Sequence, residues 1–344
     1  MKQIKKVLAL LLAIVMLFAM TSCNSVGNWI LKTENMELPV GAYIMYESTY
    51  YQYAIYYVPD YTKSPLDQEI KLEDDKKATG AEWIKTTSLD AVKSMLAVFE
   101  ECNRLGIALT ENEKKVIKDA VEDDWAAREQ AYELLGIAKS TSQKMSEYSK
   151  LDQKLFAYYY GENGTEAVTK KDITEYFEEN YASVDFFRVS IMKDSTNKLS
   201  EDEIETIRKE LDQLADRVNN GSRTMEKIVE DYNKQHSSAK VSLTSNIVVL
   251  ENTYAEDLVK KMEECDEEEA IVFEEGNYLY LFSRNKIEDE TEEYLKENED
   301  ALRHEMKDEA YYEYIDKTIE ALDITINEAA VNKYSPKWIE RKIN

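Results

Sequence analysis

Apolar and aromatic residues recur at helical spacing in the first half of the chain. Between residues 40 and 57, tyrosines alternate three and four positions apart, which places them on one face of a helix. They are Tyr43, Tyr46, Tyr50, Tyr53 and Tyr57. The same spacing of apolar residues predicts amphipathic helices that begin near residues 83, 111 and 141. Residues 24–170 are therefore expected to be a helical module, with a short strand at 29–32 and a charged loop at 66–79.

Capping signals mark where several of these helices begin and end. Thr110–Glu113 and Ser200–Glu203 each have a hydroxyl residue followed three positions later by a glutamate, which is the pattern of a capping box. Gly106 follows an apolar helical run, and glycine readily adopts the left-handed conformation that ends a helix. These signals predict helix starts at 111 and 201 and a helix end at 105.

The pattern of apolar residues changes between residues 182 and 287. Alternating and continuous apolar runs predict strands at 184–191, 241–250, 271–273 and 278–282. Helical periodicity between them predicts helices that begin near residues 201 and 225, and another at 254–262. A long acidic helix is expected from about residue 288 to 322, followed by a short extended tail at 324–326. The mixture of strands and helices predicts an α+β fold.

Composition narrows the class of protein. Nine glycines and four prolines in 344 residues are too few turn formers for a many-stranded sandwich or propeller. The formal net charge of −26 argues against a nucleic-acid binder, which needs cationic side chains on its surface. No motif predicts a metal or a cofactor, and His236 and His304 are expected to be solvated surface residues. Cys102 and Cys265 fall in different predicted domains, which favours buried free thiols over a disulfide.

The first 23 residues have the pattern of an export signal. Lys2, Lys5 and Lys6 precede an apolar run over 7–20, which is shorter than the roughly 20 residues that span a bilayer. Cys23 after this run resembles the lipid-attachment cysteine of bacterial lipoprotein signals, which implies removal of the signal peptide 1–22 and acylation of Cys23. An ordinary signal peptide with a coincidental cysteine and an uncleaved membrane anchor are the alternatives.

Three features together resemble the PrsA/SurA-type foldases, which are exported chaperones with a parvulin-like peptidyl-prolyl isomerase domain. They are the signal that ends at Cys23, the helical module with its Gly106 and Thr110–Glu113 signals, and the sequence 168–181 that leads into the first long strand. The resemblance implies a mostly helical SurA-N-like chaperone module formed by 23–181 and 288–344. A parvulin-like (PpiC-type) domain is inserted at 182–287, and the C-terminal helix and tail pack on the helical module.

The resemblance is incomplete at the isomerase active site. The family has a histidine on the first strand of the parvulin domain and another on its last strand, and Ser190 and Tyr278 occupy those positions in this sequence. Rotation about a peptide bond has a barrier of ~18–20 kcal/mol, which the enzyme lowers through a shaped pocket and fixed polar groups. The sequence therefore predicts a degenerate site without catalytic residues, with an active parvulin-type isomerase as the alternative.

The expected function is that of a membrane-anchored, extracytoplasmic chaperone or foldase-like lipoprotein that binds unfolded or nascent exported polypeptides. The five tyrosines of 43–57 are candidate peptide-binding residues, since tyrosine combines an apolar ring with a polar tip, although they could instead pack the core of the module. A lipid-anchored scaffold subunit with one dedicated partner is the alternative from another class. The membrane, reached through the lipid on Cys23, is a second expected partner, and a homodimer is a further option.

Overall fold

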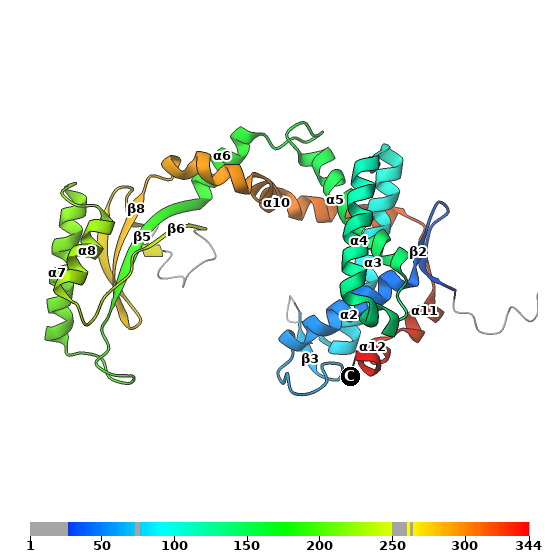
Figure 1. The fold of residues 1–344 in the computed structure, drawn as a ribbon, viewed down its shortest axis with the longest axis horizontal. Helices are drawn as coiled ribbons and strands as arrows, with labels where there is room; N and C mark the ends of the chain where they lie inside the picture. Colours follow the sequence, from blue (N-terminus) through cyan, green and yellow to red (C-terminus); the bar gives the residue numbers. More distant parts are fainter. Residues whose placement is uncertain (1–26, 73–75, 250–259, 262–263, 344) are drawn as a thin grey trace, which may run out of the picture. The chain divides into compact units, whose positions relative to one another are not determined.

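The computed structural model describes residues 27–343, apart from 73–75, 250–259 and 262–263. The chain divides into two compact units, whose elements can be followed in Figure 1. Of the described residues, the helical unit contains 27–159 together with 308–343, and the sheet unit contains those of 160–307. Helix α10 (Glu288–Ala321) contributes to both, because its residues up to 307 belong to the sheet unit and the rest belong to the helical unit.

The helical unit is built mainly from long helices and a small sheet. The long helices are α2 (Val40–Tyr57), α3 (Gly80–Leu105), α4 (Glu111–Leu134) and α5 (Lys139–Tyr160). The N-terminal strand β1 (Trp29–Lys32), which the sequence predicted, is the middle strand of the antiparallel sheet. It pairs on one side with β2 (Glu37–Pro39) and on the other with β9 (Thr325–Ile326). Strand pairing thus joins the beginning and the end of this unit.

The segment 66–79, expected from its charge to be a loop, folds partly as a hairpin. Its strands are β3 (Glu69–Lys71) and β4 (Lys77–Thr79), with Ile70 opposite Ala78. Ile70 is only 1% exposed, so a single apolar side chain anchors an otherwise charged hairpin in the core of the helical unit. Strands of three residues with one buried position give too short an alternation to be recognised in the sequence.

The extended segment expected at 324–326 contains β9, and the chain after it forms two short helices. They are α11 (Glu328–Lys333) and α12 (Pro336–Ile343). Ile339 of α12 is completely buried in the core cluster that also contains Ile44 of α2 and Ile84 of α3. The C-terminal helix therefore belongs to the hydrophobic core of the helical unit.

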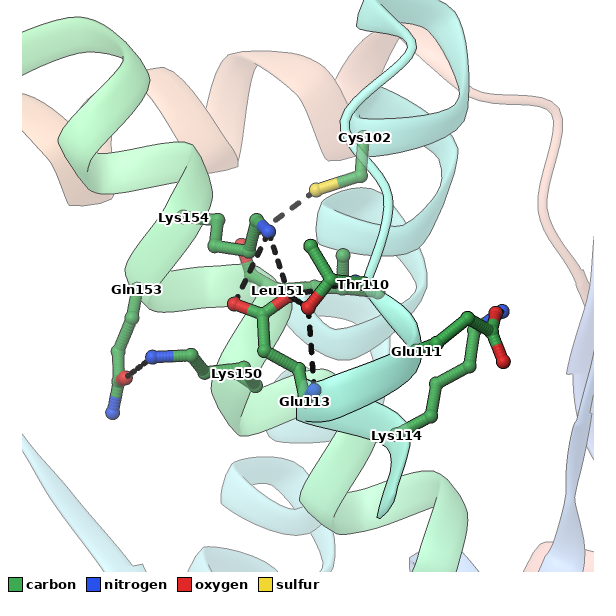
Figure 2. A network of polar contacts seen from close by, with 9 residues as sticks. All are labelled: Cys102, Thr110, Glu111, Glu113, Lys114, Lys150, Leu151, Gln153 and Lys154. Carbon is green, nitrogen blue, oxygen red and sulfur yellow. Dashed lines mark hydrogen bonds and ion pairs between the residues drawn. The ribbon is translucent and has the colours of Figure 1, made fainter. Parts of the chain in front are cut away.

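Capping interactions confirm the helix boundaries that the sequence predicted. The Thr110 hydroxyl accepts a hydrogen bond from the backbone N–H of Glu113, and the Glu113 carboxylate accepts one from the backbone N–H of Thr110 at 2.7 Å. Glu113 also accepts from Nζ of Lys154 at 2.9 Å, so one carboxylate both caps α4 and ties it to α5 (Figure 2). Ser200 caps the helix that begins at residue 201 in the same way, and Gly106 ends α3 with a φ of 70°.

The sheet unit is built on a four-stranded antiparallel sheet with the strand order β6-β5-β8-β7. Its strands are β5 (Tyr181–Ser190), β6 (Thr244–Val249), β7 (Ala270–Glu275) and β8 (Tyr278–Asn285). Helices α7 (Glu201–Asn219) and α8 (Met225–Gln235) cover one face of the sheet (Figure 1). Their apolar residues pack against Phe187, Leu279 and Leu281 to form the main core of this unit.

The α+β class predicted from the sequence is confirmed, since long helices and an antiparallel sheet coexist in one chain. The strands predicted at 184–191, 241–250, 271–273 and 278–282 correspond to β5, β6, β7 and β8. The helix predicted at 254–262 falls mostly outside the described residues. Local patterns of apolar residues were therefore sufficient to identify the sheet.

The compact units divide at 159/160 and 307/308, whereas the sequence placed the ends of the inserted domain at 181/182 and 287/288. The difference arises because α6 (Lys170–Asn180) and the first part of α10 pack together within the sheet unit. Phe177 of α6 stacks on Tyr294 of α10 with ring centroids 4.6 Å apart, and the Tyr181 hydroxyl donates a hydrogen bond to Glu305 at 2.6 Å. Contacts between segments so distant in sequence leave no local pattern.

Cys102 and Cys265 are buried free thiols, one in each unit, as the sequence favoured. Cys23 and the expected signal peptide lie outside the described residues. Within 27–343, apart from the gaps named above, no helix combines the length and the apolar character needed to cross a membrane.

Candidate functional site

The five tyrosines on one face of α2 meet different environments along the helix. Tyr43 in the first turn is completely buried, and Tyr46 and Tyr50 are half-buried. Tyr53 and Tyr57, near the end of the helix, leave 52% and 61% of their surface exposed. The row of tyrosines therefore runs from the core of the helical unit to its surface. Tyr43 packs the core, whereas Tyr53 and Tyr57 are exposed and could contact a ligand.

Three exposed tyrosines, Tyr53, Tyr56 and Tyr61, gather at the C-terminal end of α2 and in the loop after it. Together with the exposed Gln52 and the half-buried Ile55 and Val58 they line a shallow cavity of about 570 Å³, and these six residues are called the tyrosine patch. Tyr56 is 83% exposed and Tyr61 is 77% exposed. Clusters of exposed rings mark interaction surfaces, whereas single exposed apolar residues are common on any protein. This patch is the first candidate for a binding site.

Sequence reasoning named Tyr53 from the tyrosine patch but missed Tyr56 and Tyr61. Tyr56 breaks the three-four spacing of the other tyrosines, and Tyr61 lies beyond Pro59, which interrupts the helical pattern. The signal that could have found both is local density, because six tyrosines fall within residues 50–61. A search for residues spaced three and four positions apart on one helix face does not detect such a cluster.

Tyr53 of the patch contacts a cluster of neighbouring aromatic rings. Trp83 of α3 packs against Tyr50 and Tyr57, with ring centroids 5.7 and 5.4 Å apart. Tyr50 in turn meets the ring of Tyr53 at 6.2 Å in an edge-to-face arrangement. Side chains that are already ordered lose less entropy when a ligand binds to them. The end of α2 therefore presents a partly preorganised aromatic surface.

A buried carboxyl group lies nearer the start of α2. The hydroxyl of Tyr43 donates a hydrogen bond to Oε1 of Glu47, and both side chains are completely buried. Burial raises the pKa of Glu47 to about 8, although the bond from Tyr43 and the charge of Lys85 act in the opposite direction. Among the described residues, Oε2 of Glu47 has no hydrogen-bond partner. At neutral pH this side chain is therefore mainly a neutral carboxylic acid inside the core.

The two positions that replace the expected histidines lie opposite each other in the sheet unit. Ser190 at the end of β5 is paired in register with Tyr278 at the start of β8. The guanidinium of Arg188 lies 4.2 Å from the centre of the Tyr278 ring, and its Nη1 donates to the hydroxyl of Tyr280 at 3.5 Å. The Ser190 hydroxyl accepts a hydrogen bond from the backbone N–H of Met192 at 3.2 Å.

This arrangement offers aromatic surface and hydroxyl groups, with no imidazole at either position. Phe273 and Tyr280 stack with centroids 5.4 Å apart and an angle of 8° between their planes, and Tyr278 meets Tyr280 at 6.3 Å. The hydrogen bond to Tyr280 raises the pKa of Arg188, so the guanidinium stays charged. Because this cation covers the ring of Tyr278, it competes with any substrate group for the same surface.

His236 is half-buried and is not the solvated surface residue that the sequence predicted. Its Nε2 lies 2.8 Å from Oε1 of Glu210, and its ring stacks on Tyr232 with centroids 4.2 Å apart. The prediction failed because Glu210 and His236 meet only when α8 packs beside α7. His304 on α10 is also half-buried. In the part of the chain that the structure describes, no three or more His, Cys, Asp or Glu side chains group in a way that could hold a metal ion.

Comparisons with known proteins gave matches only among solved structures. A scan against protein-family models and a search of curated proteins found no match. The structure is similar to the foldase protein PrsA from Lactococcus lactis, at 12% identity and a TM-score of 0.34, over 90% of this chain and 100% of the other. It is similar to a SurA-like chaperone of Campylobacter jejuni at 13% identity and a TM-score of 0.29, over 87% and 99% of the two chains.

The peptidylprolyl isomerase PrsA from Bacillus cereus is also similar, at 11% identity and a TM-score of 0.34, over 80% of this chain and 99% of the other. The PrsA/SurA-type foldases, to which the sequence features pointed, are the same proteins that the structure comparison finds.

Proposed function

We propose that this protein is a chaperone that binds unfolded segments of exported polypeptides through the tyrosine patch at the end of α2. The observation that carries the proposal is the exposure of Tyr53, Tyr56 and Tyr61 around a cavity of about 570 Å³. Unfolded chains present the apolar side chains that folded proteins bury. Tyrosine rings can pack against these side chains, while their hydroxyls keep the empty surface compatible with water.

Binding at the tyrosine patch is expected to be weak and reversible. The patch is a shallow surface, so each bound segment removes only a small apolar area from water, and ordering the segment costs part of that gain. The net charge of −26 keeps the protein soluble and favours the approach of basic segments. Such affinity allows a client to be released without ATP hydrolysis.

The proposed place of action is the extracytoplasmic face of the cell membrane, with the lipid on Cys23 as the anchor. Support comes from the basic, apolar and small residues that precede Cys23. Two acyl chains hold a protein on a bilayer, whereas a surface of negative net charge is not attracted to anionic lipid headgroups. Release of the Cys23→Ala variant from the membrane fraction, with the lipid found on the wild-type cysteine by mass spectrometry, tests the anchor.

We further propose that the parvulin-like sheet unit does not catalyse prolyl isomerisation efficiently. Ser190 and Tyr278 in place of histidines, and Arg188 over the ring of Tyr278, support this proposal. A protease-coupled assay with a proline-containing peptide is expected to show no acceleration of isomerisation. Acceleration that disappears in the Ser190→Ala and Tyr278→Ala variants would establish the active-isomerase alternative.

Suppression of aggregation tests client binding directly. Light scattering of two unrelated, chemically unfolded proteins after dilution should fall in the presence of the wild-type protein. The double variant Tyr56→Ser, Tyr61→Ser should lose most of this protection. Val116→Ser is the matched control, because Val116 is 60% exposed on α4, outside the tyrosine patch.

Two outcomes would contradict the proposal. Full protection by the double variant would remove the client site from the tyrosine patch. Protection of none among several unrelated clients would favour the scaffold subunit with one dedicated partner.

A further inference from the structure

A second cavity, of about 340 Å³, lies within the helical unit between α2, α3, α5 and the last part of α10. Five of its lining residues are tyrosines, namely Tyr46, Tyr50, Tyr148, Tyr311 and Tyr312. Two more are aspartates, Asp152 and Asp316, and we call the site the tyrosine–aspartate cavity. Among its described lining residues none is lysine, arginine or histidine. The cavity thus combines aromatic rings with negative charge.

Asp152 interacts with most of the rings around it. The buried Tyr311 donates a hydrogen bond to Oδ1 of Asp152 at 2.6 Å. Burial, followed by the negative charge of Asp152, raises the pKa of Tyr148 and of Tyr311. Burial together with Tyr50 and Asp152 raises the pKa of Tyr46 to about 12. These tyrosines therefore stay neutral at physiological pH, and the aspartates supply the charge in the cavity.

The rings that line the cavity also contact one another. Tyr46 and Tyr50 are stacked with centroids 6.2 Å apart and an angle of 19° between their planes, and the rings of Tyr311 and Tyr312 are tilted with centroids 6.2 Å apart. The face of an aromatic ring attracts cations through its quadrupole, and this attraction grows as the cation loses water. A carboxylate beside the rings adds a direct attraction between charges. A neutral apolar group would instead remove water from Asp152 without replacing its interactions.

We propose that the tyrosine–aspartate cavity binds one organic cation, the guanidinium or ammonium group of an arginine or lysine side chain in a bound polypeptide. That the cation belongs to a polypeptide rests on the proposed function. The volume lies at the lower end of the range for small-molecule sites, which suits one long side chain. Tyr50 of this cavity contacts Tyr53 of the tyrosine patch, so α2 offers both sites to one extended segment.

Calorimetric titration of the full chain with two peptides tests the inference. The peptides are identical and rich in aromatic residues, except that one contains arginine where the other contains citrulline, a neutral analogue of similar shape. The arginine peptide is expected to bind about tenfold more tightly, which corresponds to ~1.4 kcal/mol. The difference should vanish in Asp152→Asn, which keeps an acceptor for Tyr311, and shrink in Asp316→Asn. It should persist in Asp123→Asn, a matched loss of one charge at an exposed position on α4.

The results separate this inference from the proposed function. Equal binding of both peptides, with or without Asp152→Asn, overturns the cation site and leaves client binding intact. Failure of both peptides to bind overturns the proposed function, and with it the idea that the cation belongs to a bound polypeptide. Titration with N-acetylarginine amide, a free cation, then tests the cavity without a polypeptide. If N-acetylcitrulline amide binds equally well, the cavity does not select for a cation and the inference is overturned. Circular dichroism of each variant confirms that it is folded.

Discussion

The two units bury ionisable side chains of opposite type. Among the described residues, the helical unit buries three glutamates, Glu47, Glu100 and Glu101, of which Glu47 is mainly protonated at neutral pH, and the sheet unit buries one arginine, Arg303. The aromatic surfaces follow the same division. Tyrosines of the helical unit surround Asp152, whereas Tyr278 of the sheet unit is covered by a guanidinium.

Tyrosine hydroxyls donate to carboxylates in both units: Tyr159 donates to Oε1 of Glu101 at 3.0 Å in the helical unit, and Tyr181 donates to Glu305 at 2.6 Å in the sheet unit. The contrast lies in the two aromatic surfaces. In the sheet unit the ring of Tyr278 carries a cation from its own strand pair. A surface that already holds its cation has little further attraction for another one. The comparison is consistent with the proposal that basic clients bind to the helical unit.

The largest expected effect tests whether the sheet unit depends on apolar packing. Phe187 is 1% exposed and packs on Tyr232 with ring centroids 5.5 Å apart. Phe187→Ala should cost about 3–5 kcal/mol of stability, because it leaves a cavity in the main core. Hydrogen exchange followed by mass spectrometry should show faster exchange in β5 and β8 and unchanged exchange in α3. Equal loss of protection in α3 would show that the effect of the substitution is not confined to the sheet unit.

The next effect tests the buried acid of the helical unit. Because the folded state raises the pKa of Glu47 from 4.5 to about 8, folded Glu47 keeps a proton that the unfolded chain has lost over this range. Stability of the helical unit should therefore fall as the pH rises from about 4.5 to about 8, and level off above it. The total is on the order of a few kcal/mol.

Urea unfolding of the wild type and of Glu47→Gln at pH 6 and pH 8.5 measures this effect. The glutamine keeps an acceptor for Tyr43 but cannot ionise, so the variant should lose most of the pH dependence that the wild type shows in the helical unit. The same pH dependence in both proteins would mean that other groups cause it.

A smaller effect on stability concerns carboxylates outside the core, such as Glu113, which caps α4. Thr110→Ala removes the hydroxyl that accepts from the N–H of Glu113 and should cost about 1 kcal/mol. Glu111→Gln, which breaks an exposed ion pair with Lys114 in the same turn, is the control and should change stability less. Thermal unfolding compares the variants, and an equal effect of both would argue against the reciprocal cap.

The smallest effect concerns the cation of the sheet unit. Arg188→Met removes the guanidinium from the ring of Tyr278 and should cost about 0.5–1 kcal/mol. Tyr278→Phe keeps the ring and should have less effect. Exchange rates of the amides in β8 provide the measurement. If both variants behave as the wild type does, the stacked arginine does not stabilise this face of the sheet.

Local signals in the sequence were enough for most of the fold. The capping boxes at Thr110 and Ser200, and the apolar runs of β5 and β8, involve residues within a few positions of each other. The pairing of Ser190 with Tyr278 was not predicted, because it depends on how β5 and β8 align. What was missed depends on distant packing: Ile70 in its hairpin, Ile339 in the core, and the contact of Phe177 with Tyr294.

The candidate sites were less accessible to prediction than the fold. Spacing placed Tyr43 and Tyr57 on one helix face, but only the neighbouring helices decide that Tyr43 is buried and Tyr57 is exposed. The tyrosine–aspartate cavity combines residues from four helices, and no segment of sequence contains the pair of Tyr311 and Asp152. Such sites follow from tertiary packing, which overrides local preference.

The pairing of β1 with β9 has a consequence for the order in which the molecule is assembled. Leu31 lies opposite Ile326, so one edge of β1 cannot pair with β9 until nearly the whole polypeptide has been synthesised. Residues 160–307 are continuous and can fold earlier, as units made first generally do. A chain that stops before Thr325 lacks both the last strand and Ile339, whose side chain fills the core, so we expect it to be cleaved by proteases more readily than the full chain.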